Sequence, residues 1–492
     1  MKRKLSIVVV VLFVIVALCG CASGDYIEKE SAKLDTYTMK CAYDEASHTL
    51  SVTQVSQTIN TSDESFTKLM FHLYPNAYRA EAKTTVVPTS YRKKAYIHGD
   101  SFGDIAIDSV KVGDTAVAYT VEGVDSDILC VPLSKELFPN EMATITLVYE
   151  VHLANIAHRL GYGDNAVNFG NFYPVLCYVS DGQFACDPYY NIGDPFVTNM
   201  ANYNVTLQLP KEYVLATSGN IESKTEADKL CVYEICAKTV RDFAFVCSKN
   251  FKVLQQVVGN TTVNYYHFAD KTSAETLVCA ASALQYFNDM IGVYPYAQLS
   301  IVETDFCYGG MEYPNMVMIN SLTEQYTTAV VHEISHQWFY NLVGNDQVRS
   351  AWMDEGLAEF CTLRYFDAKN EATMESQMKN ILKAYTTYVD VLSNYNKKFN
   401  TAMNRALNEY MSDTEYVYMN YVKGCIMFYS LYDTMGAKKF DKALSTYFNK
   451  CKLTVASPQS MMNCFTNAYG ASLDAVFNAY LAGEDVISQG NR

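Results

Sequence analysis

Two histidines four positions apart, His332 and His336, enclose Glu333 in the segment HEISH. On a helix, positions i and i+4 lie on one face, so both imidazoles can bind the same metal ion. Glu333 lies beside them, where a carboxylate can take a proton from water. The apolar stretches AVV and WF on either side would bury the imidazoles, and buried polar groups need partners. The pattern therefore predicts a metal-dependent hydrolase rather than a helix that carries two histidines by chance.

A catalytic zinc site takes three protein ligands and keeps one position open. No histidine follows His336, so the third ligand cannot be a later histidine. A carboxylate from the downstream segment MDEGLAE is the obvious supply. Glu355 and Glu359 compete for this role, because both can lie on the same face of a helix.

The segment HEISHQWFYNLVGNDQVRSAWMDEGLAEF resembles the gluzincin aminopeptidases, the zinc-dependent family of aminopeptidase N, whose signature is HExxH, 18 further residues and a glutamate. The resemblance implies Zn²⁺ as cofactor, with His332, His336 and Glu355 as its ligands and Glu333 as general base. Glu359 is then a supporting residue behind the ligands. The implied activity is the removal of N-terminal residues from peptides that have a free N-terminus.

Upstream, the segment GGMEYP resembles the GxMEN strand of the same family, whose glutamate binds the free amine of the substrate. By this match Glu312 is the amine-binding residue, and the backbone of Gly309 and Gly310 pairs with the substrate as an added strand. Tyr313 stands where the family has asparagine. For a second acidic residue near the amine, the sequence offers only Asp187, in the segment QFACD.

Downstream, the segment YVKG resembles the YxKG segment of the family, whose tyrosine stabilises the tetrahedral intermediate. Tyr421 is the residue in this position, and Tyr416 and Tyr418 are its rivals nearby. The Lys-Gly pair that follows Tyr421 favours it over the other two.

The chain begins with a basic segment, KRK, followed by a nearly uninterrupted apolar run over residues 5–18 that ends in LCGC. A run this short is typical of a signal peptide rather than of a membrane-spanning helix. The ending resembles the lipobox of bacterial lipoproteins, which implies lipidation of Cys21. We expect a signal peptide over residues 1–20, a polar tether over 21–34 and a protein held by its lipid on the extracytoplasmic face of the cell membrane.

Alternating apolar and polar residues at 48–55, 143–149, 204–207 and 214–217 predict short strands. Helical periodicity begins after residue 252, with helices expected over 273–291, 327–342 and 353–367 and strands over 299–304 and 316–319. The expected fold is α+β and multidomain. We expect an N-terminal antiparallel β-sandwich domain over 35–252 and a thermolysin-like, mostly helical catalytic domain with C-terminal helices over 253–492, without the long C-terminal helical domain of larger family members.

The chain has 492 residues, a formal net charge of -15 and a pI of about 5.0. It contains no basic run of the kind that binds nucleic acid, so we expect no nucleic-acid partner. Without Cys19 and Cys21, 13 of its 15 cysteines remain, an odd number that cannot all pair within one chain. By sequence spacing, Cys231 and Cys236 or Cys451 and Cys464 are near enough to bridge.

Two other functional classes compete with the aminopeptidase. The same zinc site would serve an endopeptidase or a hydrolase of another small substrate. A non-catalytic peptide-binding lipoprotein could also keep the fold, although such a protein is expected to lose its base or a ligand, and the sequence retains both.

Overall fold

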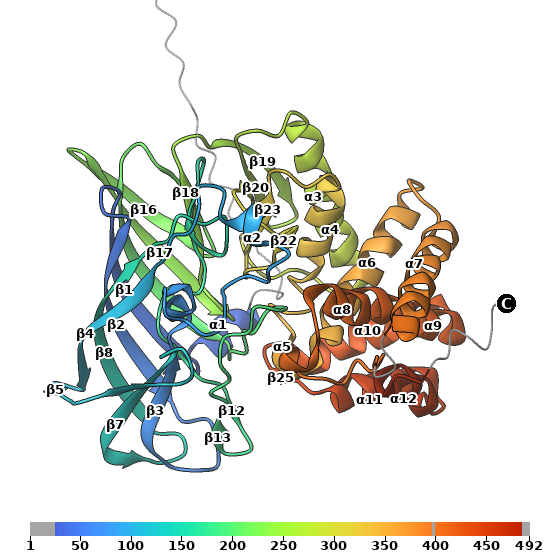
Figure 1. Ribbon diagram of the computed structural model, residues 1–492, viewed down its shortest axis with the longest axis horizontal. Helices are drawn as coiled ribbons and strands as arrows, with labels where there is room; N and C mark the ends of the chain where they lie inside the picture. Colours follow the sequence, from blue (N-terminus) through green and yellow to red (C-terminus); the bar gives the residue numbers. More distant parts are fainter. Residues whose placement is uncertain (1–24, 396–398, 485–492) are drawn as a thin grey trace, which may run out of the picture.

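The computed structural model describes residues 25–395 and 399–484. Sheets make up the N-terminal half and helices the C-terminal third (Figure 1). This order confirms the expected α+β class, with a mostly-sheet region before a helical one. Cys21 lies outside the described residues. Within the described ranges, no helix is both long and apolar enough to cross a membrane.

The largest sheet has eight strands in the order β16-β17-β14-β1-β2-β8-β4-β5. Its strands are β1 (Asp35–Asp44), β2 (Thr49–Ile59), β4 (Asp104–Val112), β5 (Thr115–Ala116), β8 (Met142–His152), β14 (Ala201–Pro210), β16 (Asn220–Ala227) and β17 (Leu230–Val240). Alternating residues of β2 are buried, as the sequence pattern predicts. The sheet is not purely antiparallel, because β14 returns after a long excursion and pairs parallel to β1.

Two further sheets in the N-terminal region have four strands each, in the orders β11-β3-β7-β6 and β15-β18-β10-β9. Their strands are β3 (Phe66–His72), β6 (Thr120–Glu122), β7 (Ile128–Leu137), β9 (Leu160–Tyr162), β10 (Val167–Phe169), β11 (Val175–Leu176), β15 (Val214–Thr217) and β18 (Phe245–Ser248). A separate hairpin joins β12 (Val179–Ser180) to β13 (Gln183–Phe184). The short helix α2 (Arg92–Ala95) and a 3-10 turn (Tyr74–Tyr78) lie in the connections.

A five-stranded sheet begins the predicted catalytic region, in the order β19-β20-β21-β23-β22. Its strands are β19 (Lys252–Val258), β20 (Thr261–His267), β21 (Gln298–Thr304), β22 (Gly310–Met311) and β23 (Met316–Asn320). The helices α3 (Ser273–Met290) and α4 (Tyr326–Ser335) pack against it and against each other (Figure 1). Since β22 is the last strand in the order, one edge of this sheet is formed by the Gly310–Met311 backbone.

The remaining chain is helical, with α5 (Gln347–Ser350), α6 (Glu355–Ala368), α7 (Met374–Tyr395), α8 (Asp413–Val417), α9 (Gly424–Met435), α10 (Ala437–Cys451), α11 (Pro458–Tyr469) and α12 (Asp474–Ala482). Between α8 and α9 lies a π-helical segment, Tyr418–Lys423, and 3-10 turns occur at Ala351–Met353 and Leu407–Glu409. Two short strands, β24 (Gly344–Asn345) and β25 (Val455–Ala456), pair in parallel.

Two of the predicted segments differ in the structure. The expected tether contains a helix, α1 (Asp25–Ser31), which contacts β17; the Ile27 carbonyl accepts a hydrogen bond from the Thr239 hydroxyl at 2.8 Å. The helix expected over 327–342 ends at Ser335. Beyond it the chain turns back on itself, with the Asn341 amide donating to the His336 carbonyl and Tyr340 at a φ of 148°. The apolar residues that suggested more helix instead pack into the core from an irregular segment.

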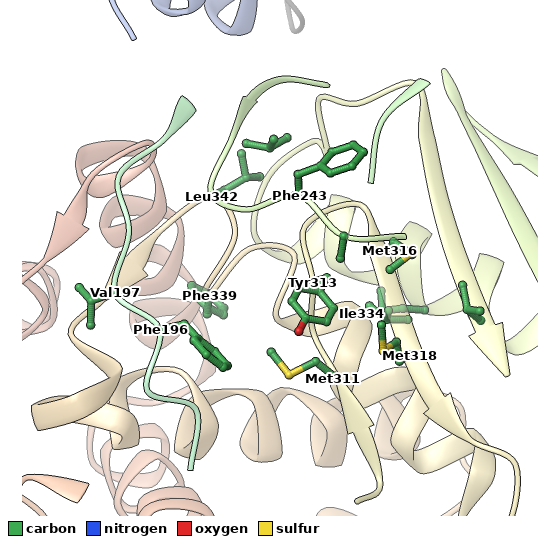
Figure 2. Close-up of a cluster of buried hydrophobic side chains, with 14 of the residues drawn as sticks. Phe196, Val197, Phe243, Met311, Tyr313, Met316, Met318, Ile334, Phe339 and Leu342 are labelled. Carbon is green, nitrogen blue, oxygen red and sulfur yellow. The ribbon is translucent and has the colours of Figure 1, made fainter. Parts of the chain in front are cut away.

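One hydrophobic core joins the β-rich region to the catalytic region (Figure 2). It brings Phe196, Val197 and Phe243 against residues of the zinc-motif neighbourhood: Met311, Tyr313, Met316, Met318, Ile334, Phe339 and Leu342. Buried Arg241 adds polar contacts across the same boundary, donating from Nε to the Tyr340 carbonyl at 2.8 Å and from Nη2 to the Thr454 carbonyl at 3.0 Å. The two regions are thus held in a fixed relation.

A close approach of two glycines sets the position of the π-helical segment relative to α6. A Cβ atom on Gly356 would lie 2.7 Å from the Gly424 Cα and 3.0 Å from the Asn420 carbonyl oxygen. No side chain fits between these backbones, so the start of α6 lies directly against the start of α9. This contact brings Glu355 and Tyr421 into the same neighbourhood.

Candidate active site

The two motif histidines and Glu355 bring three donor atoms to one point. The Nε2 atoms of His332 and His336 lie 3.0 Å apart, and the Glu355 Oε2 lies 3.3 Å from the first and 3.2 Å from the second. All three side chains are buried. Burial acts to lower the pKa of His336, but the Glu355 carboxylate outweighs it and raises that pKa to about 10. The three donor atoms are close enough together to hold one metal ion.

Contacts behind the donors orient both imidazoles. His336 donates from Nδ1 to the Phe339 carbonyl at 3.0 Å, which leaves its Nε2 lone pair free to bind a metal. The Nδ1 of His332 lies 3.2 Å from Oε1 of Glu359. Glu355 thus faces the two Nε2 atoms, whereas Glu359 stands behind His332.

Glu333 is buried beside the donor atoms, and its Oε2 has no hydrogen-bond partner among the described residues. Burial raises the pKa of Glu333 to about 7, with the two histidines acting in the opposite direction. The backbone of Gly310 lies on this carboxylate, since a Cβ atom there would be 2.3 Å from the Glu333 Oε1. Glycine at this position is therefore required for the edge strand β22 to pass so close to the predicted base.

Tyr421 lies on the π-helical segment, with its ring stacked on His332 at a centroid distance of 5.8 Å. Tyr416 lines the same cavity and meets Tyr421 edge-on at 5.9 Å. Tyr418 does not line it and stacks instead on Tyr388 at 3.8 Å. Of the three candidates, two face the site, and Tyr421 is the one in contact with a predicted metal ligand.

Glu312 is buried and accepts a hydrogen bond from the Gln347 Nε2 at 3.1 Å. The same amide group donates to Asp354 at 2.9 Å, so Gln347 joins two carboxylates. Burial raises the pKa of Glu312 well above its usual range, and the negative charge of Asp194 adds to the effect. A cation bound beside Glu312 would favour the ionised form of this group.

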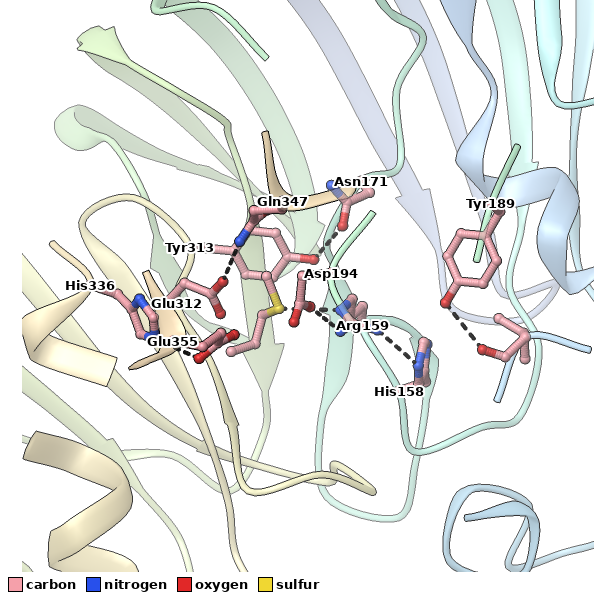
Figure 3. Close-up of polar contacts among 12 residues, drawn as sticks. His158, Arg159, Asn171, Tyr189, Asp194, Glu312, Tyr313, His336, Gln347 and Glu355 are labelled. Carbon is pink, nitrogen blue, oxygen red and sulfur yellow. Dashed lines mark hydrogen bonds and ion pairs between the residues drawn. The ribbon is translucent and has the colours of Figure 1, made fainter. Parts of the chain in front are cut away.

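Asp194 is the acidic residue that sequence reasoning missed. Its carboxylate oxygens lie within 4.8 Å of those of Glu312 and Glu355, and Arg159 forms a close ion pair with it (Figure 3). Asp187, the only acidic residue that the QFACD segment offered for this role, pairs instead with Arg349 at 2.8 Å and does not line the cavity. The only sequence signal for Asp194 was its place between a glycine and a proline, in a stretch without periodicity.

Tyr313, which stands where the related family has asparagine, faces away from the cavity. Its hydroxyl donates to Asn171 at 2.6 Å, and a Cβ atom on Gly170 would lie 1.9 Å from that hydroxyl oxygen. This tyrosine therefore fastens the Glu312 strand to the β-rich region. Gly309, by contrast, lines the cavity, and a Cβ atom there would meet no other atom within 4 Å.

The cavity has a volume of about 290 Å³ and is lined from both regions of the molecule. Its charged lining residues are Arg159, Asp194, Glu312, His332, Glu333, His336, Glu355, Glu359 and Asp413. Carboxylates outnumber cationic side chains, so the cavity attracts positive charge. The β22 edge forms part of the wall, where an extended peptide can add as a further strand.

The donor set fits a zinc ion. Two imidazole nitrogens and one carboxylate oxygen are the ligands of a common class of catalytic zinc site, and they open onto a cavity large enough for a fourth ligand. The orientation of His336 by a backbone carbonyl and of His332 by Glu359 is the arrangement that such ligands require.

Residues 276–480 match the family model described as "Peptidase family M1 domain". The chain is similar to aminopeptidase 2, mitochondrial, of Saccharomyces cerevisiae, with 24% identity over 59% of this chain and 30% of that protein. It is also similar to leucine aminopeptidase 2 of Candida albicans, with 27% identity over 31% of this chain and 27% of that protein. The chain thus spans less than a third of the length of these two curated relatives.

Solved structures share the fold over nearly the whole chain. The M1 zinc metallopeptidase of Deinococcus radiodurans superposes with a TM-score of 0.64 at 13% identity, covering 92% of this chain and 94% of that one. A variant of that protein bound to a Tyr-Ser-Ala substrate superposes with a TM-score of 0.64 at 14% identity, covering 92% and 95%.

We predict one tightly bound zinc ion per chain, held by His332, His336 and Glu355. Metal analysis of the purified protein should give stoichiometric zinc in the native chain and none in a His336→Ala, Glu355→Ala double variant. Glu359→Gln is the matched control, because it removes a supporting carboxylate; it should weaken zinc affinity by about 10–100-fold without abolishing binding. Stoichiometric zinc in the double variant would disprove the ligand assignment.

Proposed function

We propose that the protein is a zinc aminopeptidase that removes N-terminal residues from peptides, because residues 276–480 match the model of the peptidase family M1 domain. One observation carries the proposal. The carboxylates of Asp194 and Glu312 lie within 4.8 Å of Glu355, which itself touches both histidines. Two carboxylates next to the metal site can bind the terminal ammonium group of a peptide. Because this group is then fixed beside the metal, cleavage is limited to the first peptide bond.

Zinc, when bound by His332, His336 and Glu355, supplies a Lewis acid for the scissile carbonyl and a lower pKa for water. Glu333 accepts the proton of the attacking water, since it is buried beside the donor atoms with one oxygen unpartnered. It then passes that proton to the leaving amine. The Tyr421 hydroxyl donates a hydrogen bond to the oxyanion that develops on the substrate carbonyl.

The substrate is held by charge at one end and by backbone at the other. Glu312 and Asp194 bind the terminal ammonium, and the carboxylate cluster offsets the cost of removing that cation from water. Arg159 holds Asp194 in place from the β-rich side, while Gln347 holds Glu312 from α5. The Gly309–Gly310 backbone at the sheet edge pairs with the peptide main chain.

Glu333→Gln should retain zinc but lose nearly all turnover, because an amide cannot accept the proton of water. General-base removal typically lowers the rate by about a hundredfold to ten-thousandfold.

Tyr421→Phe should also lower kcat strongly with the zinc content intact, since only an oxyanion donor is removed. Tyr418→Phe is the control and should be near normal, because that ring stacks on Tyr388 outside the cavity. A larger loss in Tyr416→Phe than in Tyr421→Phe would transfer the role to Tyr416.

Glu312→Ala and Asp194→Asn should each weaken cleavage of peptides with a free N-terminus and leave the zinc content unchanged. Removing one partner of a desolvated charge pair costs about 2–5 kcal/mol. N-acetylated peptides should be poor substrates for the native protein and should gain relative to free ones in both variants. Asp187→Asn is the matched control, since Asp187 pairs with Arg349 away from the cavity.

Equal cleavage of acetylated and free peptides by the native protein would reject the amine-binding role. The endopeptidase, or a hydrolase of another small substrate, would then be the better description. Absence of any hydrolysis with zinc bound would instead favour the non-catalytic peptide-binding protein.

For localisation, we propose a lipid anchor on Cys21 at the extracytoplasmic face of a bacterial membrane. The support is in the sequence alone: the basic start, the short apolar run and the LCGC ending. Metabolic labelling with a radioactive fatty acid should mark the native protein, and Cys21→Ser should abolish the label. Cys19→Ser is the control, because that residue would leave with the signal peptide. Normal labelling of Cys21→Ser would rule out this anchor.

A further inference from the structure

Two cysteines lie side by side at the neck of the β12–β13 hairpin. The Sγ atoms of Cys177 and Cys186 are 4.0 Å apart, a distance at which one thiol can donate a weak hydrogen bond to the other. The two sulfur atoms are not joined by a disulfide bond. Neither of the pairs considered from sequence spacing involves them. Cys231 and Cys236 lie five positions apart on the extended strand β17, which separates them by roughly 16 Å at about 3.3 Å per residue and excludes a bridge.

The register of the hairpin places the two cysteines directly opposite each other. Val179 pairs with Phe184 and Ser180 with Gln183, around a two-residue turn whose residues both have positive φ. The Ala185 amide donates to the Tyr178 carbonyl at 2.7 Å, so the next pair outward is hydrogen-bonded. Cys177 and Cys186 follow just outside the two strands; if the register continues they form a non-hydrogen-bonded pair, for which opposed Cα atoms are typically about 4.5 Å apart. That separation falls within the range that a disulfide spans.

The surroundings of the two sulfur atoms differ in a way that suits thiol–disulfide exchange. Cys186 is exposed, whereas Cys177 is buried against Met70, Ile128 and Cys130. The contact with Cys177 lowers the pKa of the Cys186 thiol, and burial raises that of Cys177. Cys186 is therefore the thiol that a reagent from solution reaches and the better nucleophile of the two.

Both strands of the neck are fixed to the rest of the molecule. The Cys177 amide donates to the Met70 carbonyl at 2.8 Å, on the neighbouring strand β3. Asp187, the residue after Cys186, binds Arg349 in the catalytic region through contacts of 2.8 Å and 3.1 Å. The two thiols are thus held close together, and closing a bond between them needs only a small shift of the sulfur atoms.

We propose that Cys177 and Cys186 form an intramolecular disulfide by exchange with small-molecule disulfides such as oxidised glutathione. The Cys186 thiolate attacks one sulfur of the reagent, so that a mixed disulfide forms and one thiol leaves. Cys177 then attacks the Cys186 sulfur, giving the protein disulfide and releasing the second thiol. The protein loses two electrons and two protons, and one molecule of the disulfide reagent becomes two thiols.

The full chain offers a direct measurement, because trypsin releases both cysteines in one peptide, residues 160–211, which contains no other cysteine. The native protein is incubated with oxidised glutathione, unfolded, alkylated and digested. We expect this peptide to lose both alkylatable thiols and to be lighter by two hydrogens than the reduced peptide. Treatment with dithiothreitol before alkylation should restore both thiols.

Single variants test the order of attack. In Cys177→Ser, Cys186 should be trapped as a mixed disulfide with glutathione, because its partner is gone. In Cys186→Ser, buried Cys177 should remain a free thiol. Cys236→Ser, which removes another partly exposed thiol, is the matched control and should leave the oxidation of peptide 160–211 unchanged. The proposal is overturned if the native peptide keeps both thiols, or if a mixed disulfide on Cys186 persists in the native protein.

Discussion

Burial of many carboxylates around one small cavity is the constraint on which the rest of the site depends. Asp194, Glu312, Glu333 and Glu355 are each almost completely buried and all line the same space. Like charges this close are unfavourable unless cations or protons offset them. The two histidines offset part of the charge at Glu355, and Arg159 does so at Asp194. The negative charge that remains favours the binding of cations in this cavity.

The cavity exists only where the two regions of the chain meet. The histidines, the base and Glu312 come from the catalytic region, whereas Asp194 and Arg159 come from the β-rich region. Tyr313 fastens the Glu312 strand to Asn171 in the β-rich region, and Gly193 allows that region to approach Tyr416, since a Cβ atom there would lie 2.8 Å from the tyrosine ring. The β-rich region therefore supplies part of the site as well as packing against it.

Close backbone contacts without side chains bring the reacting groups to the right distance. Gly310 lets the sheet edge lie on Glu333, and the Gly356–Gly424 contact brings the start of α6 against the segment that carries Tyr421. Glu333 lies in space against Gly310, and Tyr421 is three residues before Gly424 in the sequence. The β22 edge, Glu333 and Tyr421 are thus placed by backbone geometry that a Cβ atom would disturb.

The sequence by itself determined the local part of this protein. The i, i+4 spacing places His332 and His336 on one helix face, and the order of strands before helices follows from periods of about two and 3.6 residues. The family resemblance indicated Glu355, Glu312 and Tyr421, and all three line the cavity. Tertiary structure alone decided the contacts between distant segments. The place of Asp194 in the cavity, the position of Glu359 behind His332, the end of α4 at Ser335 and the 4.0 Å approach of the Cys177 and Cys186 sulfur atoms all depend on how segments pack. Periodicity and spacing predict only the conformation of a single helix or strand. The partners of a side chain in distant segments are fixed by how whole elements pack, and this packing depends on residues throughout the chain.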